Sequence, residues 1–79
     1  MSVLINMTYN GQSANYRANI RAGLDDASIR RICEEAVRAG EVPGIGRNMP
    51  VDAFRNFVVD RFRGNQGVST VLRPKVPFG

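Results

Sequence analysis

The sequence has no histidine, no tryptophan and a single cysteine, Cys33. The absence of histidine removes the side chain that proteins use most often as a general base and as a metal ligand. With one cysteine and no histidine, a zinc site lacks its usual ligands. We therefore expect no metal and no other cofactor, and the lack of paired cysteines predicts a reducing compartment, the cytoplasm.

Long apolar runs are also missing. No stretch approaches the roughly 18 apolar residues of a membrane span, so we expect no membrane partner. The N-terminal sequence MSVLINMTYN lacks the basic and apolar regions of a signal peptide. Seventy-nine residues predict one small domain, 1–79. A chain of this length buries too little surface to favour a deep active site, and this favours a function in surface contact.

The formal net charge is +4, and every basic residue except Lys75 is arginine. Arginine binds phosphates and carboxylates through its planar fork, so the composition permits an acidic or nucleic-acid partner. The charge is modest and the acidic residues are interspersed, so codon preference for arginine explains the composition equally well.

The first twenty residues predict a β-hairpin. Apolar and polar residues alternate on both sides of Asn10-Gly11, which is a strong signal for a two-residue turn. One face of these strands is apolar and carries Val3, Ile5, Met7, Tyr9, Ala14, Tyr16, Ala18 and Ile20. The other face is polar, so we expect the sheet to be covered on one side only.

The next segment changes to helical spacing and predicts the main helix over about residues 26–39. Its apolar stripe contains Ile29, Ile32, Cys33, Ala36 and Val37. Asp25 or Asp26 is expected to cap its start, and Gly40 to end it. The segment that follows is predicted to be a linker, although Gly40, Gly44, Gly46 and Arg47 also suit a phosphate-binding turn.

Residues 51–62 admit two interpretations. Pro50 suits a first helical position, and Val51, Phe54, Val58 and Phe62 form a stripe, which predicts a short helix over about 51–62. The alternative takes 54–62 as a strand that pairs through the sequence RGNQG with the sequence VSTVLR, because the segment is rich in β-branched and aromatic residues. The sequence favours the helix and leaves the strand open.

The C-terminal region predicts a strand over about 68–73 that stops at Pro74, which has no backbone N–H for a ladder. Residues 74–79 form a possible extended tail. This tail either packs back on the domain or is presented to a partner through Lys75, Phe78 and Gly79, with Arg73 before it.

Hairpin, helix, linker, short helix and strand together predict an α+β fold. This order resembles the ubiquitin-like β-grasp family, in which a helix crosses a first hairpin and the last strand lies beside the first. The family's modifiers and carriers end in a double glycine, whereas this chain ends in VPFG with Gly79 alone. The predicted core contains Ile5, Met7, Tyr16, Ile20, Ile29, Ile32, Val37, Val58 and Val71.

No group of residues predicts catalysis, so we expect no enzyme. Cys33 lies in the apolar stripe, where a cysteine is usually a small core residue. The pairs Asp25-Asp26 and Glu34-Glu35 do not converge, because adjacent side chains on a helix point about 100° apart.

The sequence favours a non-enzymatic module that binds another protein, a ubiquitin-like adaptor or accessory subunit. One alternative is a small basic protein that binds nucleic acid through the Arg17 and Arg21 face; another is a modifier or carrier activated at Gly79. The candidate partner-binding residues are Arg17, Asn19, Arg21, Arg73, Lys75, Phe78 and Gly79. Free strand edges also permit a homodimer.

Overall fold

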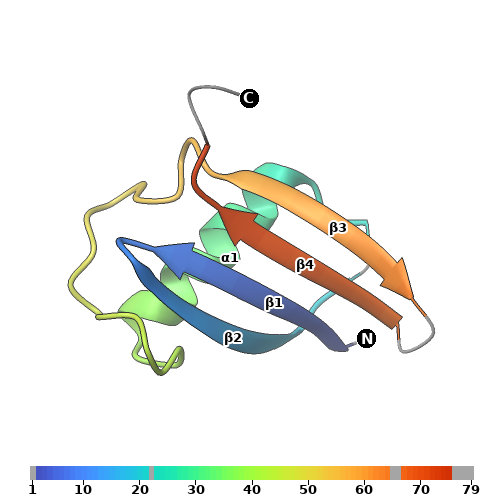
Figure 1. Ribbon diagram of the computed structural model, residues 1–79, viewed down its shortest axis with the longest axis horizontal. Helices are drawn as coiled ribbons and strands as arrows, with labels where there is room; N and C mark the ends of the chain where they lie inside the picture. The colour runs from blue at the N-terminus through green and yellow to red at the C-terminus, as the bar shows by residue number, and fades with distance from the viewer. Residues whose placement is uncertain (1, 22, 65–66, 76–79) are drawn as a thin grey trace.

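The computed structural model describes residues 2–21, 23–64 and 67–75, and in these ranges one helix lies across one face of a mixed four-stranded sheet (Figure 1). The strands are β1 (Ser2–Tyr9), β2 (Gln12–Asn19), β3 (Val58–Gly64) and β4 (Gly67–Arg73), and the helix is α1 (Asp26–Arg38). The strand order is β2-β1-β4-β3. Of these three strand pairings, that of β1 with β4 is parallel and the other two are antiparallel. The α+β prediction is confirmed, and the arrangement is compatible with the β-grasp architecture.

The N-terminal hairpin forms where the sequence predicts it. Asn10 and Gly11 both have positive φ angles, of 53° and 79°, and Tyr9 pairs with Gln12 across the two-residue turn. Positive φ at both central positions matches the right-handed twist of the flanking strands, and Asn-Gly adopts it at low cost. The turn therefore fixes the register that places Ile5 opposite Tyr16.

Helix α1 begins and ends with the expected caps. The Asp25 carboxylate accepts a hydrogen bond from the backbone N–H of Ser28 at 2.9 Å. At the other end Gly40 has a φ of 79°, and its N–H donates to the carbonyl of Val37. The N–H of Glu41 donates to the carbonyl of Ala36, which completes a Schellman motif. The prediction of the main helix is confirmed, and its last helical residue is Arg38.

The predicted short helix over 51–62 is wrong. Residues 51–56 form successive turns, in which the N–H groups of Ala53, Arg55 and Phe57 each donate to the carbonyl three residues earlier. Asp52 has a φ of 62°, which interrupts a right-handed helix. From Val58 the chain becomes strand β3, which pairs with β4 along its whole length. The alternative assignment of a strand within 54–62 was therefore correct for its second half.

Strand β4 begins one residue earlier than predicted, at Gly67, and ends at Arg73, immediately before Pro74. It lies between β1 and β3, so it has a neighbour on each side. A proline cannot donate to a ladder, which explains the stop. The tail residues Phe78 and Gly79 lie outside the described residues.

The core lies between the sheet and α1. Its buried apolar side chains are Val3, Ile5, Met7, Ala18, Ile29, Cys33, Ala36, Val37, Val42, Ile45, Met49, Phe54 and Leu72. Of the predicted core, Ile5, Met7, Ile29 and Val37 are buried. The half-buried Tyr16 and Ile20 pack against it, and Ile32 is also half-buried.

The core assignments of Val58 and Val71 are wrong. Leu72 and Val59 pair across β4 and β3 and face the core, so their neighbours Val71 and Val58 point to the other face of the sheet. Side chains alternate along a strand, and a shift of one residue reverses every assignment. Both valines are half-buried on the face opposite the helix.

Residues 39–57 contribute more than a linker. Val42, Ile45, Met49 and Phe54 in this segment are buried. Three polar contacts fix it to the rest of the domain: Tyr16 Oη donates to Glu41 Oε1 (3.2 Å), Gly46 N to Gln12 Oε1 (3.3 Å) and Asp52 N to Glu34 Oε1 (2.8 Å). The segment therefore completes the cover over the sheet beside α1.

Phe54→Ala is expected to destabilise the protein by about 3–5 kcal/mol, enough to unfold much of it. The Phe54 side chain is 1% exposed and contacts the rings of Tyr9 and Phe57 at centroid distances of 5.6 and 4.9 Å. The matched control is Val51→Ala in the same segment, where the side chain is 67% exposed. It should change the free energy of unfolding in urea by less than about 0.5 kcal/mol. Equal effects of the two variants on the free energy of unfolding would contradict the burial of Phe54 in the core.

Asp25→Ala is expected to reduce the free energy of unfolding at neutral pH. The variant should also lose less of this free energy than the unmodified protein as the pH falls. Hydrogen bonding to Ser28 lowers the pKa of Asp25 below 3.8, so the ionised carboxylate favours the folded state. That stabilisation is present above the unfolded pKa and is lost as the pH falls through the lower folded pKa. Urea unfolding between about pH 6 and about pH 2 measures it. Asp25→Asn retains a capping acceptor and should show the same loss of pH dependence; an unchanged pH dependence in both variants would contradict the role.

Candidate functional site

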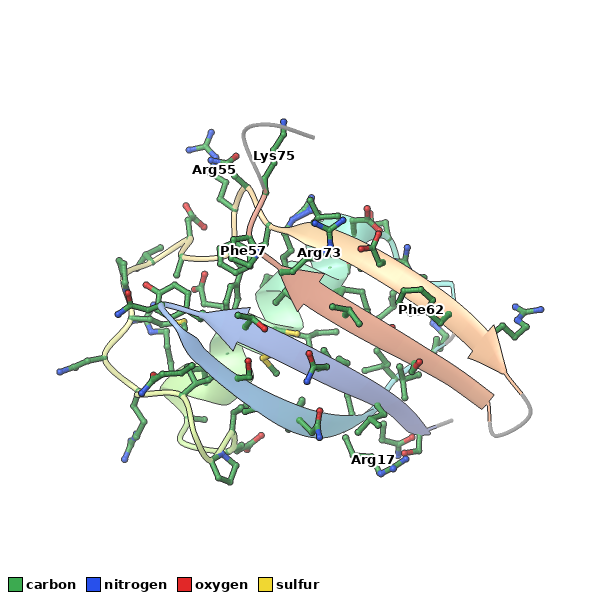
Figure 2. All side chains as sticks on the ribbon, viewed as in Figure 1. Arg17, Arg55, Phe57, Phe62, Arg73 and Lys75 are labelled. Atoms are coloured by element: carbon green, nitrogen blue, oxygen red, sulfur yellow. The ribbon has the colours of Figure 1, made fainter. Side chains whose placement is uncertain are left out.

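The sheet face opposite α1 has no covering layer in the described residues, and we call it the open face. Figure 2 views it directly, with Arg17, Phe62 and Arg73 labelled. Strand alternation places every second side chain on it. Its described side chains are Ser2, Leu4, Asn6, Thr8, Ser13, Asn15, Arg17, Asn19, Val58, Asp60, Phe62, Ser69, Val71 and Arg73.

The half of the open face on β1 and β2 is a ladder of polar pairs. Asn6 Nδ2 donates to Asn15 Oδ1 at 2.9 Å, and the hydroxyls of Thr8 and Ser13 are 3.1 Å apart. Arg17 Nη1 donates to Ser2 Oγ at 3.2 Å. These cross-strand bonds are exposed to solvent, so they set the side-chain geometry and contribute little net stability.

The open face is more apolar on β3 and β4 and at Leu4 of β1. Leu4 on β1 is in register with Ser69 on β4, and Ser69 is in register with Phe62 on β3. Phe62 is 55% exposed, whereas Leu4 and Val71 are half-buried. An exposed aromatic ring beside aliphatic side chains is a surface suited to contact with another apolar surface.

An ion pair lies at one end of this apolar area. Arg73 Nε is 2.7 Å from Asp60 Oδ2, and both side chains remain more than a third exposed. Exposed pairs of this kind contribute about 0–1 kcal/mol. The pair therefore does little for stability, but it neutralises the charge of Arg73 on the open face.

The predicted partner-binding residues do not form one surface. Arg17 and Asn19 lie on the open face at β2, and Arg21 follows the strand. Arg73 and Lys75 lie at the opposite end of the sheet from Arg17, where Lys75 is beside Arg55 (Figure 2). The structure separates the predicted arginine face into two groups.

Sequence reasoning missed Phe62, Leu4 and Val71 as surface residues. Leu4 was a visible signal, because it was the one apolar residue on the polar side of the first strand. Phe62 and Val71 could be placed only after β3 was recognised as a strand and the register of β4 was known. No local pattern supplies that register.

The groups considered for catalysis have structural roles. Cys33 is fully buried, and burial raises the pKa of its thiol to about 12, so it stays protonated at neutral pH. This confirms its assignment to the core. Asp25 caps α1, and Glu34 accepts from Asp52 N and lies 3.6 Å from Arg38 Nη1.

No protein-family model, curated protein or solved structure matches the chain. Within the described ranges, no cluster of histidine, cysteine, aspartate or glutamate is arranged to hold a metal ion. In the same ranges no helix has the length and apolar character needed to cross a bilayer.

Cys33 is expected to react with Ellman's reagent at least about a hundredfold more slowly in the native protein than in urea. The native thiol is inaccessible and protonated, so reaction requires opening of the core. Absorbance at mildly alkaline pH measures the rate, and Cys33→Ala supplies the blank. Fast native reaction would show an accessible thiol and would contradict the assignment of Cys33 to the core.

Proposed function

We propose that this chain is a non-enzymatic, β-grasp-like module that binds another protein through its open face. Its architecture supports the β-grasp part of the proposal. A helix crosses one side of the sheet, and the last strand lies parallel to the first, in the order β2-β1-β4-β3. This agrees with the strand arrangement of the family that the sequence resembles.

The observation that carries the proposal is the exposed ring of Phe62 within a sheet face that has no covering layer in the described structure (Figure 2). Protein interfaces commonly have an aromatic anchor surrounded by aliphatic and polar side chains. Phe62 with Leu4 and Val71 supplies the anchor, and the Asn6–Asn15 pair supplies polar groups beside it.

The residues first considered for catalysis also favour a binding function over an enzymatic one. The thiol of Cys33 is enclosed in the core. The carboxylates of Asp25 and Glu34 are engaged by backbone N–H groups. These side chains stabilise the fold and present no reactive group to a substrate.

Nucleic-acid binding through Arg17 and Arg21 receives less support. The open face carries the carboxylate of Asp60, which pairs with Arg73. A phosphate backbone needs several convergent cations, and Arg17 lies at the other end of the sheet from Arg73 (Figure 2). This alternative still predicts binding that weakens steeply with salt.

The test places the photocrosslinker p-benzoylphenylalanine at position 62, with position 35 as the control. Glu35 is exposed on α1 and so reports the opposite side of the domain. We expect a specific protein adduct from position 62 and none from position 35. Mass spectrometry identifies the adduct, and the partner is then purified for titration calorimetry.

With the purified partner, Phe62→Ala should weaken binding by at least about tenfold, the effect of losing an anchor residue. Glu35→Ala is the matched exposed control and should leave the affinity unchanged. Equal affinities of the two variants would overturn the open face as the binding surface. Binding of a short DNA or RNA that Arg17→Ala weakens, without a protein adduct, would support the alternative.

A further inference from the structure

A second feature lies on the helix side of the sheet and extends to the edge strand β3, where Phe62 of the open face is among its lining residues. A cavity of about 340 Å³ lies beside the segment that leads from β2 into α1. Its apolar wall is formed by Val3, Ile20, Leu24 and Ile29. Val3 and Ile29 belong to the buried core, so the cavity is continuous with the interior. Its volume falls at the small end of the roughly 300–1,000 Å³ typical of ligand sites.

Three arginines also line this cavity: Arg21 after β2, and Arg61 and Arg63 on β3. Arg61 is fixed in place, because its Nη1 is 2.7 Å from Asp26 Oδ1 and its Nη2 donates to the carbonyl of Leu24 at 2.6 Å. In the described ranges Arg21 and Arg63 make no ion pair. Asp26 balances the charge of Arg61, whereas Arg21 and Arg63 have no acidic partner there, so the lining of the cavity carries a net positive charge beside its apolar wall.

We propose that this cavity binds a small carboxylic acid with an apolar tail of about ten non-hydrogen atoms in all. The tail fills the space against Val3, Leu24 and Ile29. The carboxylate remains at the mouth, where Arg21 and Arg63 donate hydrogen bonds to it. Guanidinium groups match the planar geometry of a carboxylate, so the head group and the tail each have a complementary wall.

The arginines that line the cavity favour an acid over an uncharged apolar ligand. An uncharged ligand would gain only from the apolar wall, whereas an acid would also be attracted by the charges of Arg21 and Arg63. A short acid such as acetate would meet the arginines without filling the cavity. We therefore expect binding to require both the carboxylate and the apolar tail, and a probe molecule can lack either of them.

The probe is sodium octanoate, titrated to about 10 mM into the ¹⁵N-labelled protein and followed by ¹H–¹⁵N spectra. We expect saturable shifts at the amides of Val3, Ile29 and Thr70, which line the cavity. Octanol lacks the charge and acetate lacks the tail. Each should bind at least about threefold more weakly, the effect expected from an exposed ion pair or from lost apolar contact.

The double variant Arg21→Gln with Arg63→Gln should weaken octanoate binding about threefold to tenfold. The matched control is Arg17→Gln with Arg55→Gln, which removes the same charge at exposed positions outside the cavity lining. It should change the affinity by less than about twofold, through long-range charge alone. Absence of saturable shifts, octanol binding as tight as octanoate, or equal effects of the two double variants would each overturn the proposal. Because the probe is a small acid, its result is independent of the protein partner.

Discussion

A single short helix cannot cover a four-stranded sheet, and most features of this domain follow from that constraint. Helix α1 has 13 residues and so extends about 20 Å, whereas the molecule measures 33 by 32 Å across its two longer axes. Residues 39–57 supply the missing cover with buried side chains such as Ile45, Met49 and Phe54. Near the start of the helix the cover is incomplete, and the cavity beside Leu24 lies there.

The sheet face opposite α1 follows from the same shortage of helices, because no element of the described structure covers it. Without a second layer, strands β1 and β2 present polar pairs such as Asn6 with Asn15, which tolerate water. Strands β3 and β4 place Val58 and Val71 on this face, and Phe62 is more than half exposed. The sheet is therefore asymmetric in character from one edge to the other. This asymmetry gives the open face a defined apolar area, which suits recognition of a partner surface.

Local signals in the sequence were sufficient for about half of the fold. Asn10-Gly11, the cap at Asp25 and the stop at Pro74 each act within a few residues, and each is observed in the structure. The segment from Val51 to Phe62 was different, because its apolar residues satisfy a helical period as well as a strand. Its conformation is decided by pairing with β4 and by the left-handed backbone at Asp52, and neither can be read from periodicity.

The candidate site was harder to predict than the fold, because it depends on register. Arg17 was placed correctly on a polar face, but Arg73 lies at the far end of the sheet and pairs with Asp60 (Figure 2). The distance between two surface residues depends on which strands are neighbours and on their alignment. The register of β3 with β4 places Phe62 on the open face, and the sequence alone does not reveal this register.

The parallel pairing of β1 with β4 also determines how the chain can fold during synthesis on a ribosome. Ile5 is in register with Thr70, so the first strand gains its second neighbour only after nearly all of the described chain has been made. Until then Met7 and Leu72 cannot pack together, and one edge of β1 has no partner strand. The domain is therefore expected to fold after its last strand leaves the exit tunnel, in a step slowed by closure of a long loop.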